Sequence, residues 1–193
     1  MEWSLPVSVN IDGKNIKIRK KCDYRVVLDT IDVLNDKELN TECMILCALY
    51  IFYDIPKKTK SLETDVLRVI TDINKATTEM LKIINLGKEP EEKSVPRIVD
   101  WKHDFPSMVP PINRVLGYSV RDENHYTHWY DFVGAFMEIG ESSFTNIVSI
   151  RYKKSKGKKL DKWEEEFYRE NRELIDLPYN LTPEEEEFLN SDW

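Results

Sequence analysis

The sequence predicts a mainly α-helical fold, a bundle of about 6–8 helices that follows a short N-terminal β-hairpin. Composition favours helices, because the 193 residues include only 6 glycines and 33% of the residues are charged. Apolar residues recur at spacings of three and four along much of the chain, which is the period of amphipathic helices. Around Asp12-Gly13, in contrast, apolar and polar residues alternate as they do in strands.

The predicted hairpin covers residues 7–18 and turns at Asp12-Gly13. Both turn residues tolerate positive φ, and this dipeptide is a strong signal for a two-residue hairpin turn. With this turn Val9 faces Ile16, and the apolar side chains of both strands share one face. These side chains are those of Val7, Val9, Ile11, Ile16 and Ile18. Because an isolated ribbon is marginally stable in water, we expect this face to pack on helices.

Three helices are predicted between the hairpin and residue 86. Asp23 caps the first, which ends at residues 35–36. The second starts at residue 40 or 41 and stops near residue 56, and since it is apolar almost all round we expect it to be central and buried. The third is a long helix over residues 61–86 whose apolar stripe alternates spacings of four and three. This stripe either faces the protein's own core or is offered to a long helical partner.

A change of composition at residues 87–97 predicts a linker. This segment contains one Gly and two Pro among charged residues. We therefore divide the chain into an N-terminal half with the hairpin, residues 1–86, and an aromatic-rich C-terminal helical half, residues 98–176. Residues 177–193 form an acidic tail, in which Thr182-Pro183-Glu184-Glu185 predicts the start of a short helix.

The C-terminal half begins with an aromatic stretch that ends at Phe105-Pro106. A short helix is predicted over residues 107–116; Pro110-Pro111 must begin or break it, and Gly117 ends it. The next helix, over residues 126–139, is the most aromatic of the chain and is expected to anchor this half.

The last part of the C-terminal half is predicted to be helical and strongly charged. Ser142 or Ser143 caps a helix that carries apolar residues as far as Ile150. The run 151–159 holds six basic side chains and no acid, which favours a flexible, solvated connector. A charged helix is predicted after it, over residues 160–174.

Charge, hydropathy and cysteine usage narrow the classes of partner and location. The net charge of −7 repels phosphate backbones at long range, which argues against nucleic acid as the main partner. The longest apolar run, residues 43–53, is about half of the roughly 20 residues that cross a bilayer. The first residues also lack the basic and apolar regions of a signal peptide. We therefore expect a cytoplasmic protein without membrane contacts, in which Cys22, Cys43 and Cys47 are reduced, buried thiols.

No arrangement of residues indicates catalysis or cofactor binding. His125-x-x-His128 places two imidazoles on neighbouring helical turns, but no third ligand has the spacing of a zinc site. His103 stands beside Asp104, yet no nucleophile motif accompanies the pair. The scattered glycines form no phosphate loop. The sequence therefore predicts a protein that is not an enzyme, with no catalytic residues, metal, cofactor or small-molecule substrate.

The order of several motifs carries a family resemblance. His128-Trp129-Tyr130-x-Phe132 follows Tyr126 and precedes an apolar helix and then Phe144-x-x-Ile147-x-x-Ile150-Arg151. The hairpin, the apolar run before Pro56 and Trp101-x-x-Asp104-Phe105 lie in the same order as in the family. Over residues 5–176 the chain resembles the tail assembly chaperones of Gram-positive bacteriophages, encoded near the tape-measure protein gene. It departs from them at Tyr130, where a second Trp is frequent, at Pro110-Pro111, and in the added tail.

This resemblance implies a non-catalytic role in phage tail assembly. The implied partner is the tape-measure protein, with a companion tail chaperone or a tail tube protein as a further partner. The implied place is the cytoplasm of the host bacterium, and the protein should be absent from the mature virion. Two alternatives are a structural component of the tail, and a regulator that binds nucleic acid through residues 151–159. The candidate core or partner-binding residues are Trp101, Phe105, Tyr126, Trp129, Tyr130, Phe132, Phe136 and Arg151.

Overall fold

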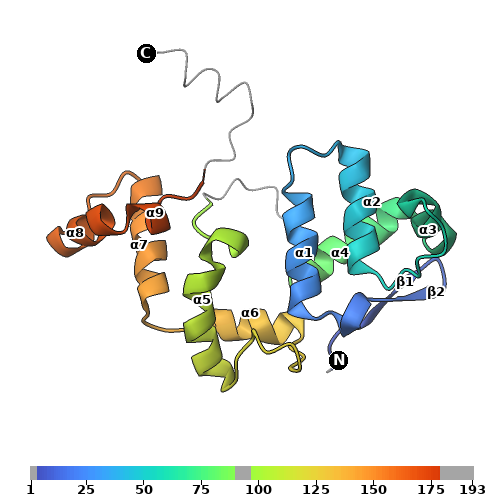
Figure 1. The fold of residues 1–193 in the computed structure, drawn as a ribbon, viewed down its shortest axis with the longest axis horizontal. Coiled ribbons are helices and arrows are strands. Elements are labelled where there is room, and N and C mark those ends of the chain that lie inside the picture. Colours follow the sequence, from blue (N-terminus) through green and yellow to red (C-terminus); the bar gives the residue numbers. More distant parts are fainter. Residues whose placement is uncertain (1–3, 90–96, 179–193) are drawn as a thin grey trace, which may run out of the picture.

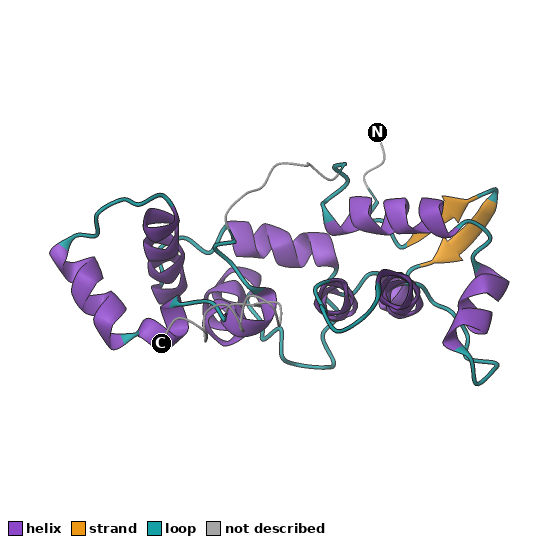
Figure 2. Cartoon of the chain, turned by 90° about the horizontal axis from the view of Figure 1, so that it is seen from above, coloured by secondary structure: helices purple, strands orange, loops and turns teal. Residues whose placement is uncertain are grey.

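The fold is mainly helical and is described by a computed structural model for residues 4–89 and 97–178. These residues form nine α-helices, eight of them with seven or more residues, after a two-stranded antiparallel hairpin. The predicted fold class is confirmed. Along the long axis of the molecule, the hairpin and α3 lie at one end, α1 with α4 and α5 with α6 occupy the middle, and α7–α9 form the other end (Figures 1 and 2).

The hairpin consists of β1 (Ser8–Ile11) and β2 (Lys14–Lys17), with Val9 opposite Ile16 as predicted. Both turn residues have positive φ, 51° at Asp12 and 81° at Gly13. The apolar face is buried against the helices except at Val7, which is 42% exposed. The turn is also tied to α4 (Ile73–Ile84), because Lys75 Nζ lies 3.1 Å from the Asp12 carboxylate.

Helices α1 (Tyr24–Leu34) and α2 (Thr41–Phe52) pack against each other and begin at the predicted caps, Asp23 and Asn40. The expectation that α2 is buried all round is wrong. Its last turns are buried at Ala48, Leu49 and Phe52, whereas Ile45 and Leu46 are only partly buried. The physical reason is that neighbouring elements cover the end of α2, while its first turns border an open groove.

Two of the three cysteines lie on this partly covered helix. Cys43 is exposed and Cys47 is partly buried, so the expectation of buried thiols is wrong for Cys43. Cys22, just before α1, is fully buried, and this burial raises the pKa of its thiol to about 12. All three are free thiols.

The long helix predicted over residues 61–86 is two helices, α3 (Leu62–Val69) and α4, separated by a break at residues 70–72. Ile70 has extended backbone angles, φ −102° and ψ 115°, and its side chain is buried. Asp72 then caps α4 by accepting a hydrogen bond from the Lys75 amide at 2.9 Å. The prediction was wrong because β-branched residues and an Asp, which favour extended and capping conformations, outweigh the apolar period.

Helix α5 (Trp101–Leu116) starts earlier than the predicted residue 107 and contains all three prolines of this region. Asp100 is its N-cap and accepts hydrogen bonds from the Lys102 amide at 2.9 Å and the His103 amide at 2.8 Å. This strong cap begins the helix before the prolines, which then remove amide donors without ending it. Gly117, with φ 77°, ends the helix as predicted.

Helix α6 (Trp129–Met137) is shorter than predicted, because His128 is its N-cap and leaves Tyr126 outside it. Helix α7 (Ser143–Ser155) starts at the predicted cap, Ser142. It continues through the first residues of the basic run, so the expectation of a flexible connector is wrong for residues 151–155. The single charged helix predicted over residues 160–174 is wrong in extent: the segment forms two helices, α8 (Lys162–Glu170) and α9 (Arg172–Ile175), which are separated at Asn171.

One main hydrophobic core, from Val9 to Phe144, contains side chains from both sides of the predicted linker. A smaller cluster joins α7 to α9 through Ile147, Ile150 and Ile175. The division into two halves stays a prediction, since most of the linker 87–97 lies outside the described residues. The tail helix predicted within residues 177–193 lies outside them as well.

Candidate partner-binding groove

A groove of about 410 Å³ opens between the first turns of α2, the outer face of α3 and the start of α4. Its lining is mostly aliphatic, with two carboxylates. We call it the α2–α3 groove; its lining residues are Thr41, Glu42, Ile45, Leu46, Glu63, Leu67 and Ile73. Leu67 is 51% exposed, so its side chain is open to contact from outside the fold.

The α3 side of the groove is held by one buried carboxylate, Asp65. It accepts hydrogen bonds from the amides of Lys58 at 3.0 Å and Thr59 at 3.1 Å. Arg68 adds an ion pair at 3.1 Å. Burial alone would raise the pKa of Asp65, but these two amides and Arg68 outweigh it and lower that pKa. Asp65 therefore ties α3 to the loop before it, while Leu67 and Glu63 remain outside.

Chemically, the α2–α3 groove is suited to binding apolar side chains. No His, Cys or Lys lines it, and its two carboxylates belong to different helices. Its volume lies within the range of about 300–1,000 Å³ that is common for binding pockets. In the described residues, no group of three or more His, Cys, Asp or Glu is placed to hold a metal ion.

The structure gathers the predicted aromatic residues at the centre of the molecule, away from the groove. Trp129 and Phe132 are buried, while Trp101, Phe105 and Phe136 are partly buried. The ring of Trp101 lies 5.5 Å from that of Trp129 and 5.0 Å from that of Phe136. These residues thus form one cluster shared by α5 and α6.

Polar atoms fix this aromatic cluster to other elements. Trp129 Nε1–H donates a hydrogen bond to the Ile84 carbonyl at 3.0 Å, which joins α6 to the end of α4. The ring of Tyr24 stacks on Phe132 with 4.3 Å between centroids, which joins α6 to α1. The Tyr24 hydroxyl donates to the Val120 carbonyl at 2.7 Å. The cluster therefore connects helices on both sides of the linker.

Two of the predicted tyrosines lie at the margin of the cluster. Tyr126 is 50% exposed, and its hydroxyl donates to the Lys21 carbonyl at 2.7 Å. Burial of that hydroxyl, followed by the nearby Cys22 and Asp23, raises the pKa of Tyr126 to about 12. Tyr130 is partly buried and meets the His128 ring edge-on at 5.3 Å.

Arg151 lies apart from the aromatic residues, in a buried polar junction between α5, α7 and α9. Its Nη1 and Nη2 atoms donate to the two Asp104 oxygens at 2.6 and 2.8 Å. The remaining N–H groups donate to carbonyls at 2.6–3.1 Å, those of Ile98, Leu174 and Ile175. All five guanidinium donors are used, so Arg151 holds the last helix in place and is not free to bind a partner.

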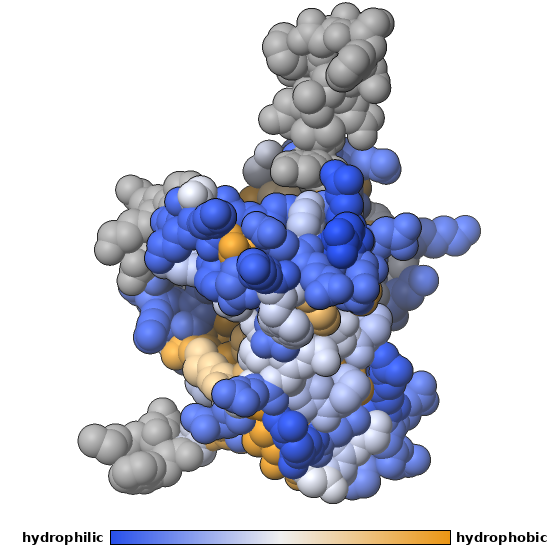
Figure 3. Space-filling model, turned by 90° about the vertical axis from the view of Figure 1, so that its left-hand side faces the viewer, coloured by the Kyte–Doolittle hydropathy of each residue, from blue (hydrophilic) through white to orange (hydrophobic). Residues whose placement is uncertain are grey.

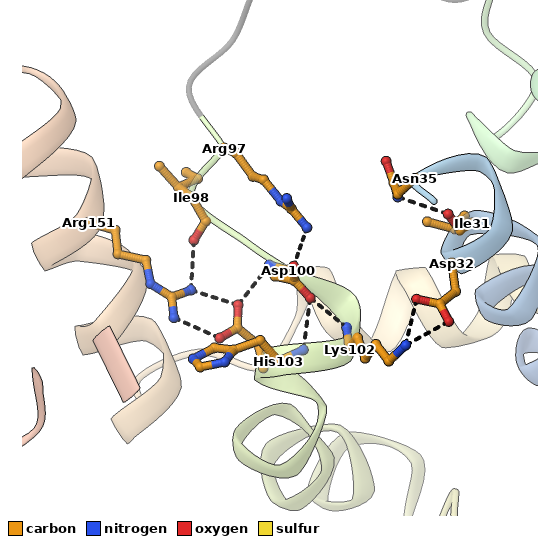
Figure 4. A network of polar contacts seen from close by, with 10 residues as sticks. Ile31, Asp32, Asn35, Arg97, Ile98, Asp100, Lys102, His103 and Arg151 are labelled. Atoms are coloured by element: carbon orange, nitrogen blue, oxygen red, sulfur yellow. Dashed lines mark hydrogen bonds and ion pairs between the residues drawn. The ribbon is translucent and has the colours of Figure 1, made fainter. Parts of the chain in front are cut away.

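The same junction reaches across the molecule to α1. Figure 4 shows Arg151 facing the start of α5, with Asp100 between Arg97 and Lys102. Arg97 pairs with the Asp100 carboxylate, and the Lys102 ammonium lies 2.8 Å from Asp32 on α1. Among the described residues, no buried side-chain nitrogen or oxygen lacks a hydrogen-bond partner.

The histidines have separate structural environments. His128 Nδ1 accepts a hydrogen bond from the Tyr130 amide at 3.0 Å, so its Nε2–H is the donor to the Pro6 carbonyl. His125 instead contacts the Asp122 carboxylate at 2.9 Å and stacks on Tyr118. His103 lies 3.3 Å from the Leu174 carbonyl, while its neighbour Asp104 is held by Arg151.

The basic run is partly neutralised by nearby acids. Lys153 pairs with Glu164, and Lys154 pairs with Asp176 at 2.7 Å. The face of the molecule on the α7–α9 side is largely hydrophilic, with only small apolar areas (Figure 3). In the part of the chain that the structure describes, no helix combines the length and apolar composition needed to cross a bilayer.

Sequence reasoning missed the α2–α3 groove because it searched for aromatic and chemically reactive residues. One signal was available in Leu67, an apolar residue that lies outside the stripe formed by Leu62, Val66 and Ile70. An apolar residue on the polar face of an amphipathic helix is a candidate contact. The break after Val69, which the period did not predict, is what leaves α3 beside α2 in this arrangement.

Comparison with known protein families gives a match over nearly the whole chain. The family model described as Bacteriophage Gp15 protein matches residues 1–177. This range includes the hairpin, the helices α1–α9 and every residue that lines the α2–α3 groove. No curated protein and no solved structure matches the chain.

Proposed function

The chain belongs to the bacteriophage Gp15 protein family, and from this premise we propose that it is a tail assembly chaperone. The expectation of a bacteriophage protein is thereby confirmed. In the proposed role the chain is not an enzyme; it binds the tape-measure protein in the cytoplasm of the host, keeps it soluble and helps the tail tube assemble. It then leaves, so that the mature virion lacks it.

The observation that carries this proposal is the α2–α3 groove on an acidic, helical protein. A tape-measure protein, as the family resemblance implies, is a long helical chain with apolar surface that must be covered before assembly. Amphipathic helices bind in apolar grooves through side chains one turn apart. The partly exposed aliphatic lining of the groove supports reversible binding of this kind, since the groove is too small to bury a partner permanently.

The direct test is co-expression with the tape-measure protein of the same phage. We expect the soluble fraction of the tape-measure protein to rise and the two chains to co-purify. A matched control is co-expression with an unrelated aggregation-prone helical protein, whose solubility should not change. If the tape-measure protein stays insoluble and forms no complex, the proposal is wrong.

Mass spectrometry of purified virions separates a chaperone from a structural component of the tail. A chaperone should be missing from particles that contain the tape-measure and tail tube proteins in full amount. Stoichiometric recovery of this chain from virions would make it a tail component instead. The same infected cells can be used for a pull-down, which would identify a companion chaperone if one takes part.

A further inference from the structure

We propose that the α2–α3 groove binds one amphipathic helix whose apolar stripe is flanked by Lys or Arg. The inference rests on the proposed function, in that the occupant is a helix of a protein that this chain chaperones. It goes further by naming the site and the chemistry of the helix that the site selects. Two features of the described residues support it, the shape of the lining and its charge. The composition of residues 179–193 adds a third argument.

The lining offers apolar side chains from three elements to one occupant. Ile45 and Leu46 come from α2, Leu67 from α3 and Ile73 from the first position of α4. A bound helix would place residues spaced i, i+3 or i+4 and i+7 against such a lining. Of these four side chains, Leu67 is the most accessible to a partner, because it is 51% exposed.

The charged residues of the lining determine which charge a partner helix should carry beside its apolar stripe. Glu42 and Glu63 are exposed carboxylates, and among the described residues neither has an ion-pair or hydrogen-bond partner through its side chain. Each stands in the first turn of its own helix, where the helix dipole favours an acid. The dipole accounts for the two carboxylates but has no bearing on the exposed Leu67, one turn after Glu63 on α3. A partner helix with basic flanks would pair with both carboxylates, and one with acidic flanks would be repelled.

The same charge argument disfavours occupants that belong to this chain. Residues 179–193 contain apolar side chains but also five acids and no Lys or Arg. This segment would therefore bring negative charge to a negative lining. A second copy of the chain, joined groove to groove, would likewise place Glu42 and Glu63 against themselves. The charge complement of the groove is a basic helix from another protein.

The test uses the full chain and two designed helical peptides that share one leucine stripe. One peptide has Lys at the flanking positions and the other has Glu; binding is measured by fluorescence anisotropy at low and physiological salt. We expect the Lys peptide to bind at least about tenfold more tightly, and this advantage to shrink as salt rises. Equal binding of both peptides would overturn the assignment of a basic partner.

Substitutions in the α2–α3 groove test whether the Lys peptide binds there. Leu67→Ser should weaken binding of the Lys peptide by about tenfold, because it removes an apolar contact of the lining. The double variant E42Q/E63Q should weaken it less and remove most of its salt dependence. Met137→Ser is the matched control, since Met137 is 67% exposed on α6 and outside the groove, and it should bind like the parent. Thermal melts followed by circular dichroism establish that each variant is folded.

The outcomes for the site and for the function can be told apart. If Leu67→Ser binds the Lys peptide as the parent does, the groove is not the site. If Leu67→Ser dissociates a dimer of this chain in sedimentation experiments, the occupant is a second copy and the proposal is wrong. If Leu67→Ser still solubilises the tape-measure protein fully, the groove proposal fails and the chaperone function stands. Failure of the unmodified chain to solubilise that protein, in contrast, would refute the function itself.

Discussion

The aromatic cluster of α5 and α6 and the α2–α3 groove are both rich in large apolar side chains, but they are enclosed to very different degrees. In the cluster, Trp129 is 2% exposed and its indole N–H donates a hydrogen bond to the Ile84 carbonyl. In the groove, Leu67 is 51% exposed. A dense run of aromatic residues thus indicates the core here, and an isolated leucine on a polar helix face indicates the free surface.

The charged side chains of the two regions differ in the same way: those near the core are buried and paired, and those of the groove are exposed and, in the part of the chain that the structure describes, unpaired. At the polar junction between α5, α7 and α9, Asp104 and Arg151 are buried and fully hydrogen-bonded to each other and to backbone groups. At the groove, Glu42 and Glu63 are exposed and have no side-chain partner among the described residues. Partnered charge therefore stabilises the fold, and unpartnered charge is available to a ligand.

Replacing Trp129 with Ala should have the largest effect on stability. The change opens a cavity in the cluster and leaves the Ile84 carbonyl without its donor. The expected loss in the free energy of unfolding is about 4 kcal/mol, measured by urea denaturation. Met137→Ala on the same helix should change stability by no more than about 0.5 kcal/mol. If Trp129→Ala folds with full stability and loses only partner binding, Trp129 is a contact residue and the comparison between cluster and groove breaks down.

Removing the carboxylate of Asp104 should cost slightly less, roughly 3 kcal/mol, because it leaves a buried guanidinium without its counter-charge. Asp104→Ala keeps the three carbonyl acceptors of Arg151, and this limits the loss. A double variant with Leu at 104 and Met at 151 should regain much of the stability, since it removes both charges. A double variant that is no better than the single one would show that the junction acts through its carbonyl contacts and not through the ion pair.

Asp65 should make the free energy of unfolding depend on pH. Asp65→Asn should cost less stability than Trp129→Ala or Asp104→Ala, because Asn still offers one acceptor oxygen. The pKa of Asp65 is lowered in the folded protein, so its contribution is complete above about pH 3.9, the ordinary value for Asp. That contribution is lost as the pH falls through the lower, folded-state pKa. Urea denaturation at pH 7, 5, 4 and 3 should therefore show a shallower acid decline for Asp65→Asn than for the parent.

A control on the same helix sharpens this measurement. Glu63→Gln removes an exposed carboxylate of α3 that, among the described residues, interacts only with the dipole of its own helix. Its acid decline should therefore stay much closer to that of the parent than the decline of Asp65→Asn does. Should Asp65→Asn decline as steeply as Glu63→Gln, the loop before α3 does not depend on the Asp65 charge. The α3 side of the groove would then be held by packing of Val66 and Ile70 alone.

Much of the fold could be predicted because the signals were local. Turns and helix ends were determined by residues that act on their own neighbours, through side-chain caps or positive φ. They are Asp12-Gly13, Asp23, Asn40, Ser142 and Gly117. At some positions the apolar helical period and a capping residue predicted different helix bounds, and the sequence did not indicate which of the two signals would prevail. At Ile70 to Asp72 capping won and the long helix divided; at Asp100 it won again and began α5 before its prolines.

The candidate site was less predictable because exposure depends on neighbours that are distant in sequence. Nothing local distinguishes Ile45, which lines the groove, from Leu49, which is buried one turn later on the same helix. The position of α3 beside α2 determines which of these two side chains is buried and which lines the groove. Arg151 was recognised as a notable residue, but its partners Asp104 and Leu174 come from 47 and 23 positions away.

The smallest stability effect is expected at Leu67. Leu67→Ser should change the free energy of unfolding by no more than about 0.5 kcal/mol, since the side chain already faces solvent. Leu49→Ala, across the same pair of helices, should cost about 2–5 kcal/mol because Leu49 is fully buried. A loss of that size at Leu67 would mean that the groove is closed in solution and that Leu67 belongs to the core. A negligible loss would show that Leu67 contributes little to the fold, which leaves its side chain free to contact a partner in the groove.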